Sequence, residues 1–365
     1  MAPSLLKINA MKKTFVFAGF LLLTFNHMLA QSKKVAVIVD ERVELITTMQ
    51  LLFDYPLVGK TDIKYKQELV DNFSRYQNDT SVLYFLNIAE NNFGFNKPFN
   101  IGYHYTFPGF KQNIPFSDAE NTQYEFGKHP EWKEPYADAL KRFYAISGFH
   151  TFYKDHRSFY DSLIAGVATT VDSADVIGIL ENHYGVKQHS YTLVLSPLSI
   201  ESGYSIWIKT KKGNDLYSIV GPNLESKITP DFDKRWIMQK LVIHEFSHPF
   251  CNPLIDKYYS LFEKDTCLFS PIKKALKQQG CGSWHNALSE FLTRANEIVL
   301  TEHIFCKDDA DKVYNDYLNQ GWIYIRDILP IIKKYEANRT QYKTLEDIMP
   351  EVIAYFDEEA KHCNL

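Results

Sequence analysis

The sequence lacks the features that mark several common classes of protein. Its 365 residues carry 40 Lys and Arg against 44 Asp and Glu, so it has no excess of positive charge of the kind that binds nucleic acid. Glycine and proline are few, at 16 and 15 residues, which excludes collagen-like and low-complexity architectures. The chain has no internal repeat, no Gly-rich phosphate loop, no G-x-S-x-G elbow and no dinucleotide fingerprint. These absences leave a globular protein, 45% hydrophobic and long enough to bury a core.

Cysteine is also scarce, and its spacing excludes one kind of metal site. The five cysteines are Cys251, Cys267, Cys281, Cys306 and Cys363, and none forms a C-x-x-C pair. A cysteine-based zinc site is therefore not indicated. Five is an odd number, so at least one thiol stays unpaired within the chain. The spacing permits a Cys267–Cys281 or a Cys281–Cys306 bridge, or buried free thiols, and leaves these alternatives open.

The N-terminal 30 residues have the pattern of a signal peptide with a ten-residue extension in front of it. Lys12 and Lys13 precede the mostly apolar stretch Phe15–Phe25, and the small residue Ala30 stands before Gln31 at the expected cleavage position. Removal of residues 1–30 takes away three lysines and no acid, so the net charge changes from −4 to −7. No later segment reaches the roughly 18 apolar residues of a membrane span. We therefore predict a secreted or periplasmic protein with no membrane span after signal cleavage.

The order of the expected elements predicts an α+β fold. Residues 34–39 have the apolar pattern of a buried strand, and residues 189–221 contain three strand-like runs separated by turn residues. Helical periodicity dominates the rest of the first half and everything after about residue 232. Because most of the expected strands follow one another without intervening helices, the chain does not consist of alternating βαβ units. We predict a mixed N-terminal region over 31–188, and over 189–365 a catalytic region with a sheet followed by an active-site helix and a helical C-terminal half. No linker marks a boundary, so we expect the two regions to form a single compact unit.

One motif carries clear chemical information. His244-Glu245-Phe246-Ser247-His248 matches the H-E-x-x-H pattern, which on a helix places both imidazoles on one face, where they can bind one metal ion. The carboxylate of Glu245 would then lie close enough to act as general base toward a water molecule and as general acid toward the leaving amine. Because Pro249 follows directly, we expect the helix to kink or end there, with turn chemistry at Cys251–Pro253.

A catalytic zinc site needs a third protein ligand. The metzincin extension would place Gly at position 251 and His at 254, where this chain has Cys251 and Leu254. The gluzincin pattern instead takes a glutamate from a second helix downstream, and residues 284–300 form a helical segment with Glu290 and Glu297. We favour Glu290, because apolar neighbours suit an inward-facing carboxylate and Arg294 at i+4 can hold it. Glu297 remains the alternative.

HEFSH followed by SEFLTRA resembles the gluzincin metallopeptidases, and more closely a group of exported bacterial proteins of unknown function classed as probable peptidases. The resemblance covers roughly residues 240–298, with weaker similarity in VELITTMQLL, KHPEWKEP and LVLSPLSIESGYSIW. It implies a zincin-like fold, a Zn²⁺ cofactor and hydrolysis of a peptide or protein substrate. It also implies a strand edge, at Leu193–Ser199 or Tyr204–Ile208, that aligns an extended peptide.

The resemblance further implies a residue that stabilises the oxyanion, usually Tyr or His. His285, Tyr258, Tyr259 and Tyr204 are candidates, and Asn252 is a further residue that could line the site. The sequence thus predicts a zinc metallopeptidase. A non-catalytic zinc protein that binds peptides or glycans, and a zinc hydrolase of another amide or ester, are the alternatives.

Overall fold

The computed structural model describes residues 33–116, 132–172, 175–200, 202–223, 230–232 and 237–364. The expected signal peptide, with its cleavage site at Ala30–Gln31, lies outside these residues. Lys33–Leu365 form one compact unit, to which the regions on either side of residue 188 both belong.

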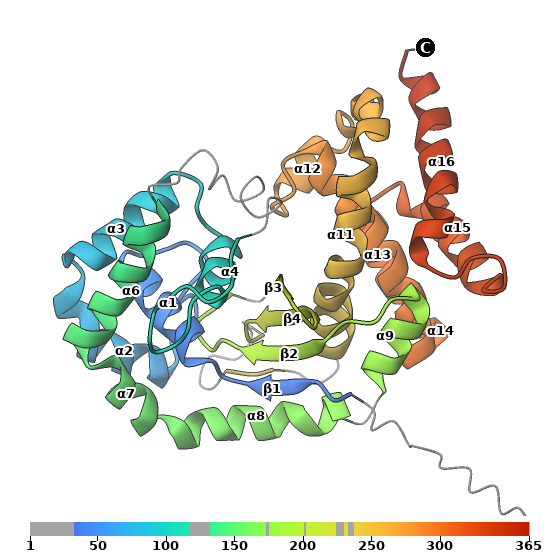
Figure 1. The fold of residues 1–365 in the computed structure, drawn as a ribbon. Coiled ribbons are helices and arrows are strands. Elements are labelled where there is room, and N and C mark those ends of the chain that lie inside the picture. The colour runs from blue at the N-terminus through green and yellow to red at the C-terminus, as the bar shows by residue number, and fades with distance from the viewer. Residues whose placement is uncertain are drawn as a thin grey trace, which may run out of the picture. The chain divides into compact units, whose positions relative to one another are not determined.

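Four strands form a mixed sheet in the order β1-β2-β4-β3 (Figure 1). They are β1 (Ala36–Ile38), β2 (Ser190–Leu195), β3 (Gly203–Thr210) and β4 (Gly213–Val220). β2 runs parallel to both β1 and β4, whereas β3 pairs antiparallel with β4. Because β1 pairs with β2, the N-terminal region contributes a strand to the sheet of the second region. β3 lies at the edge, since within the described residues it pairs only with β4.

The β3–β4 hairpin turns where the sequence carries Lys211, Lys212 and Gly213. Gly213 has φ of +123°, a conformation that favours glycine. The Thr210 hydroxyl donates to the Gly213 carbonyl at 2.8 Å and closes the turn. Local turn chemistry therefore sets the β3–β4 register, in which Tyr204 faces Ile219.

Helices make up most of the first half outside the strands, as the periodicity predicts. α1 is capped by Asp40, whose carboxylate accepts from the amides of Arg42 and Val43. The packing of α8 beside β1 and of α4 beside β3 joins these helices to the sheet. The elements are α1 (Glu41–Leu52), α2 (Lys64–Phe73), η1 (Ser74–Tyr76), α3 (Thr80–Glu90), α4 (Lys97–Tyr103), α6 (Lys133–Ser147), α7 (Phe149–Asp155), α8 (Arg157–Asp172) and α9 (Val176–Tyr184).

The described part of the second half is helical after β4, which confirms the predicted α+β class with a helical C-terminal half. α11 packs against α13 and against strands β3 and β4, so it stands between the sheet and the other C-terminal helices (Figure 1). The elements are η3 (Ile237–Val242, a π-helical turn), α11 (Ile243–Phe262), η4 (Glu263–Phe269), α12 (Lys273–Lys277), α13 (Trp284–Ile304), α14 (Lys307–Asn319), α15 (Ile325–Ala337), η5 (Leu345–Ile348), α16 (Met349–Lys361) and η6 (His362–Asn364).

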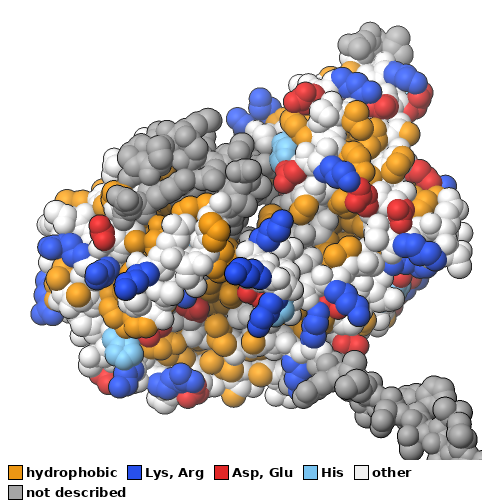
Figure 2. All heavy atoms as spheres, in the orientation of Figure 1, with side chains coloured by type: hydrophobic (Ala, Val, Ile, Leu, Met, Phe, Trp, Pro, Cys, Tyr) orange, Lys and Arg blue, Asp and Glu red, His pale blue; other side chains and the backbone are white. Residues whose placement is uncertain are grey.

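The surface carries charges of both signs. On the face in Figure 2, acidic and basic side chains lie interspersed over the C-terminal helices, with hydrophobic side chains between them. Ion pairs such as Lys264–Asp357 and Lys334–Glu351, both at 2.8 Å, account for part of this mixture. Among the described residues no single helix meets the length and hydropathy of a membrane span; the pair Arg157–Val171 and Val176–Tyr184, bent by 56°, meets it only jointly.

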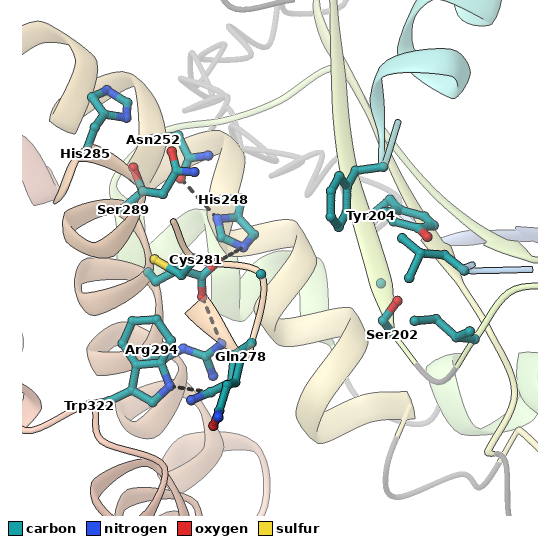
Figure 3. A pocket seen from close by; sticks show the side chains of 18 of the residues that line it. Ser202, Tyr204, His248, Asn252, Gln278, Cys281, His285, Ser289, Arg294 and Trp322 are labelled. Carbon is teal, nitrogen blue, oxygen red and sulfur yellow. Dashed lines mark hydrogen bonds and ion pairs between the residues drawn. The ribbon is translucent and has the colours of Figure 1, made fainter. Parts of the chain in front are cut away.

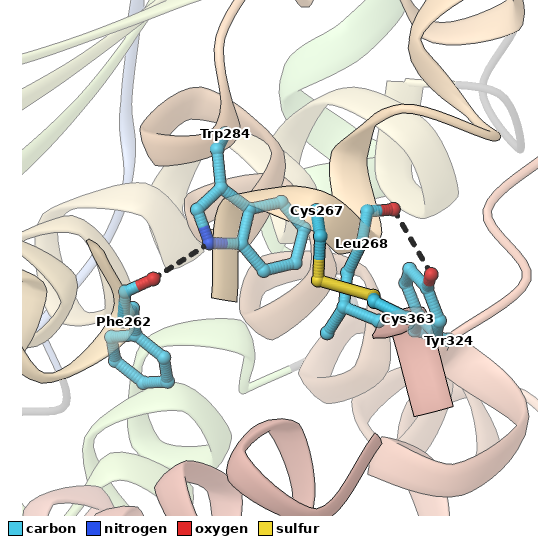
Figure 4. The surroundings of a disulfide bond; sticks show 6 residues. All are labelled: Phe262, Cys267, Leu268, Trp284, Tyr324 and Cys363. Carbon is cyan, nitrogen blue, oxygen red and sulfur yellow. Dashed lines mark hydrogen bonds between the residues drawn. A yellow bond between two sulfur atoms is a disulfide. The ribbon is translucent and has the colours of Figure 1, made fainter. Parts of the chain in front are cut away.

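A disulfide joins Cys267 in η4 to Cys363 in η6, 96 residues later (Figure 4). Neither bridge suggested by the spacing forms, because Cys281 lies free and buried. The prediction of at least one unpaired thiol is confirmed, since Cys251 and Cys306 are also free. The bridge fastens the C-terminal end of the chain beside the segment that follows α11. Sequence distance alone could not reveal this pairing, because it depends on how α16 returns to η4.

Candidate metal centre

α11 carries the H-E-x-x-H motif at its N-terminal end, in its most buried part. His244 and His248 are each 8% exposed, and Glu245 is 6% exposed. One helical turn separates the two histidines, so their rings meet: the two Nε2 atoms lie 3.1 Å apart. The motif therefore lies on a helix with both imidazoles on one face, as the sequence predicts.

The helix does not end after the motif. α11 continues through Pro249 and Pro253 to Phe262, so the expected end at Pro249 and turn at Cys251–Pro253 are wrong. Proline lacks an amide hydrogen, so Pro249 cannot donate to the carbonyl of Glu245 one turn earlier. The hydroxyl of Ser205, on strand β3, donates to that carbonyl instead, at 2.7 Å. The proline is thus accommodated by a bond that ties the motif to the edge strand.

Glu290 on α13 completes a group of three metal-binding side chains. The helix begins at the cap Ser283, whose hydroxyl accepts from the Asn286 amide, and it packs along α11. Glu290 Oε2 lies 3.6 Å from His244 Nε2, and Oε1 lies 3.5 Å from His248 Nε2. One ligand atom from each of the three residues falls within 4.8 Å of the others.

These separations fit a metal ion. Two ligands bound tetrahedrally at about 2.0–2.1 Å lie about 3.3–3.4 Å apart, close to the 3.1, 3.5 and 3.6 Å found here. The chemistry of the donors agrees, because each histidine uses its other nitrogen, Nδ1, toward an acceptor. Two Nε2 lone pairs and a carboxylate then face one another, an arrangement that is repulsive until a cation joins them.

Glu297, the alternative third ligand, lies on the other side of His244. Its Oε2 atom accepts from Nδ1 of His244 at 2.8 Å and from the hydroxyl of Tyr317 at 2.5 Å. The Glu297 side chain is fully buried. A carboxylate in this place fixes the ring orientation and tautomer of a histidine ligand and does not reach the Nε2 side. The structure therefore places Glu290, and not Glu297, among the three converging groups.

His248 has an equivalent partner that sequence reasoning treated only as a residue near the site. Asn252 Oδ1 lies 3.0 Å from Nδ1 of His248, and the Thr293 hydroxyl is 3.3 Å from the same nitrogen. Asn252 is four residues beyond His248 on the uninterrupted helix, and this i+4 spacing is the signal that could have identified it. Tyr317, on α14, carries no such signal.

Arg294 holds Glu290 as its i+4 spacing predicts. Its Nη2 atom lies 3.0 Å from Glu290 Oε2, and its guanidinium stacks 4.4 Å from the ring centres of both Tyr317 and Trp322. Burial raises the pKa of Glu290, but the charge of the guanidinium, together with that of the two imidazoles when these are protonated, outweighs burial and lowers that pKa to about 2. Glu290 is therefore ionised, the state in which a carboxylate binds a metal.

Glu245 lies against the start of the edge strand. A Cβ atom on Gly203 would fall 2.4 Å from Glu245 Oε1, so only glycine leaves room for this carboxylate. Burial, followed by the negative charge of Glu290, raises the pKa of Glu245 well above its usual value, and Arg294 only partly opposes the shift. A raised pKa moves a carboxyl group toward the range in which it exchanges protons near neutrality.

A cleft of about 600 Å³ opens beside the metal centre. Figure 3 shows His248, Arg294 and Trp322 on one wall and Ser202 and Tyr204 on the wall across from it. Of the expected oxyanion-stabilising candidates, Tyr204 and His285 line this cleft and Tyr258 and Tyr259 do not. Tyr258 instead donates to Glu346 Oε1 at 2.8 Å, toward η5.

The two segments expected to align a peptide substrate differ in how their strands are paired. The segment Leu193–Ser199 begins within β2, which is paired on both sides and offers no free edge there. The pairing therefore does not favour that alternative. The other, Tyr204–Ile208, belongs to the edge strand β3, whose first residues border the cleft.

Together these features define a protein with a helix-borne His, His and Glu metal-binding site beside the edge strand of a small mixed sheet. Comparison with known families places the chain in the family described as Domain of unknown function (DUF4932), whose model matches residues 110–355. Every residue of the metal centre falls within this match. No curated protein and no solved structure matched the chain.

Proposed function

We propose that the protein is an exported zinc-dependent metallopeptidase. His244, His248 and Glu290 bind the metal, and Glu245 acts as general base and acid. The observation that carries this proposal is the convergence of three Lewis bases at ligand distances, with a further buried carboxylate at the edge strand beside them. Two histidines and one carboxylate are one of the donor sets of catalytic zinc sites, which leave a fourth position for water or substrate. The proposed cofactor is therefore Zn²⁺.

In this mechanism the protein's own groups orient, polarise and move protons. Glu297 and Asn252 hold the two imidazoles, and Arg294 holds Glu290, so the metal-binding atoms are positioned before any metal arrives. Bound zinc would supply Lewis-acid polarisation of the scissile carbonyl and of the attacking water. Glu245 takes a proton from that water and delivers it to the leaving amine.

The proposed substrate is an extended peptide bound in the cleft. The first residues of β3, Gly203 and Tyr204, line the cleft next to Glu245, where an edge strand can form main-chain hydrogen bonds with a peptide. The Asn96 side chain already donates to the carbonyl of Ser205 at 3.3 Å. Because the Ser205 carbonyl already has a partner, we place the main-chain hydrogen bonds with the substrate at the N-terminal end of β3, beside Glu245.

Export agrees with the N-terminal signal pattern and with the disulfide. Disulfides persist in oxidising compartments such as the periplasm and the extracellular space, and are rare in the cytosol. The Cys267–Cys363 bridge therefore supports the proposed location.

The test is metal analysis and peptide hydrolysis on the chain from residue 31 onward. We expect close to one zinc per chain, and cleavage products from a synthetic peptide library. Glu245→Gln should keep the zinc and lower kcat by about 10²–10⁴-fold, the usual contribution of a general base. Glu302→Gln, at a half-buried position near the end of α13 that does not line the cleft, is the matched control and should leave both readouts unchanged.

Three outcomes would contradict the proposal in different ways. A protein that takes up no zinc after zinc loading has no such metal site. Unchanged turnover in Glu245→Gln would exclude Glu245 as the base. A zinc-loaded protein that cleaves no peptide would favour the alternatives, a binding protein or a hydrolase of another amide or ester, and a panel of model esters and amides would separate those two.

A further inference from the structure

Phe95 is an exposed aromatic residue at the wall of the cleft. Of the large hydrophobic side chains in the described part of the chain it is the most exposed, at 54%. It lines the same cavity as His248 and Glu290. Exposure of a phenyl ring to water is unfavourable, and this ring is exposed in the lining of the candidate active-site cleft.

The backbone holds Phe95 there in a conformation that bulky residues rarely adopt. Its φ is +54°, in the left-handed region, where a phenylalanine is strained. The hydroxyl of Tyr55 accepts from the Phe95 amide at 2.9 Å. The preceding residue must be small, because a Cβ on Gly94 would fall 2.2 Å from the same hydroxyl. The left-handed backbone of Phe95, its hydrogen bond to Tyr55 and the small residue Gly94 together hold this segment in place.

The residues around Phe95 make this wall apolar and firmly attached to the edge strand. Leu57 and Ile200 line the cleft with it, and the Ile200 amide donates to the Leu57 carbonyl at 3.2 Å. Asn96, next to Phe95, donates to the Ser205 carbonyl of β3. The facing wall is polar: the residues of α11 and α13 there include Asn252, Asp256, His285, Asn286 and Ser289.

We propose that Leu57, Phe95 and Ile200 form a subsite for a large apolar side chain of the substrate, with Phe95 as its specificity-determining residue. This inference rests on the proposed peptidase function. The preferred substrates are peptides with Phe, Leu or a similar residue beside the cleaved bond, because such a side chain covers the exposed ring and removes apolar surface from water. Acidic side chains gain nothing against this wall and lose hydration.

The experiment compares quenched-fluorescent peptides that differ at one position, Phe, Leu, Ala or Asp, beside a bond identified with the peptide library. We expect wild-type kcat/KM to favour Phe and Leu over Ala by about 10–100-fold, the range that an apolar pocket can supply. Phe95→Ala should remove most of this preference, because it lowers kcat/KM for the Phe and Leu peptides far more than for the Ala peptide, and the zinc content should stay the same. Phe95→Leu should restore much of it. Tyr55→Phe, which removes the hydroxyl that holds the loop, should weaken the preference in the same direction.

Leu83→Ala is the matched control, since Leu83 is also an exposed apolar residue, at 45%, but lies on α3 outside the lining of the cleft. It should change neither the preference nor the rates. An unchanged preference in Phe95→Ala, or an equal loss for all four peptides, would overturn the subsite.

A binding measurement separates this inference from the proposed function. Fluorescence anisotropy of the same peptides on zinc-loaded Glu245→Gln, with and without Phe95→Ala, reports recognition without cleavage. If the wild type cleaves nothing, peptides of one fixed sequence with Phe, Leu, Ala or Asp at the central position are used instead; binding that prefers the apolar peptides and depends on Phe95 then keeps the subsite, and the peptidase proposal fails. Binding that is equal for all peptides, or absent, overturns the subsite whatever the catalytic result.

Discussion

Glu44 provides a sharp test of the packing around the sheet. This carboxyl group lies on α1 and is fully buried; the hydroxyl of Tyr65 donates to it at 2.7 Å and that of Ser196 at 3.2 Å. Burial raises its pKa from 4.5 to about 8, even though the two hydroxyl hydrogen bonds act in the opposite direction. The native protein therefore keeps a proton on Glu44 that the unfolded chain releases.

The sign and size of the effect on stability follow from this difference. Between pH 4.5 and about 8 the native state binds the extra proton, so the free energy of unfolding falls as the pH rises. A shift of about 3.5 pH units at about 1.4 kcal/mol each corresponds to roughly 5 kcal/mol, fully expressed above pH 8. Glu44→Gln keeps the shape of the side chain and removes its titration; its amide oxygen still accepts from one hydroxyl, and the other hydroxyl can reorient to accept from the amide NH2 group.

The assay is urea unfolding of wild type and Glu44→Gln at a series of pH values from 5 to 9. We expect the two proteins to be similar near pH 5, and the variant to be more stable by several kcal/mol at pH 9. Taking the difference between the proteins cancels the titration of other groups. Glu90→Gln, an exposed change on α3, should show no such divergence. A difference that stays constant across the range would refute the assignment of a protonated, buried Glu44.

Two further predictions concern the metal centre. Glu297→Ala should weaken zinc binding about 10–100-fold, the usual effect of removing a partner behind a histidine ligand, and Glu290→Ala should weaken it more, since it removes a ligand; competition with a chromogenic chelator measures both, and the reverse order would make Glu297 the ligand. Gly203→Ala should retain zinc but lower kcat by about 10²-fold or more, because its methyl group displaces the Glu245 carboxylate from its place at the edge strand. Equal kcat in Gly203→Ala and wild type would show that Glu245 does not act from this position.

The sequence by itself determined the features that depend on short-range geometry. Residues four apart on a helix share a face, so His244 and His248 were predictable as a pair, and Arg294 as the partner of Glu290. The consecutive strand-like runs and the long helical periodicity were enough to predict the α+β class, because strand and helix periodicities are local properties of the chain. The odd number of cysteines alone implied a free thiol.

Only the tertiary structure showed which of the two glutamates on α13 lies among the metal-binding groups. Glu290 and Glu297 lie seven residues apart on one helix, and their different roles arise because α13 crosses α11 so that one reaches Nε2 and the other Nδ1 of His244. Pro249 was expected to kink or end the helix. The helix does not end there, and the hydroxyl of Ser205, on a strand distant in sequence, donates to the Glu245 carbonyl. Local rules cannot anticipate a donor that another element supplies.

The surroundings of the centre depend even more on long-range packing. The choice of β3 as the free edge, the bridge between Cys267 and Cys363, and the meeting of Phe95 with the cleft each join segments far apart in the chain. No spacing in the sequence encodes those distances, because they are set by the order of strands in the sheet and by the return of α16 to η4. The motif was therefore visible in the sequence, whereas the residues that orient it and the wall that faces it emerged only when the chain was folded.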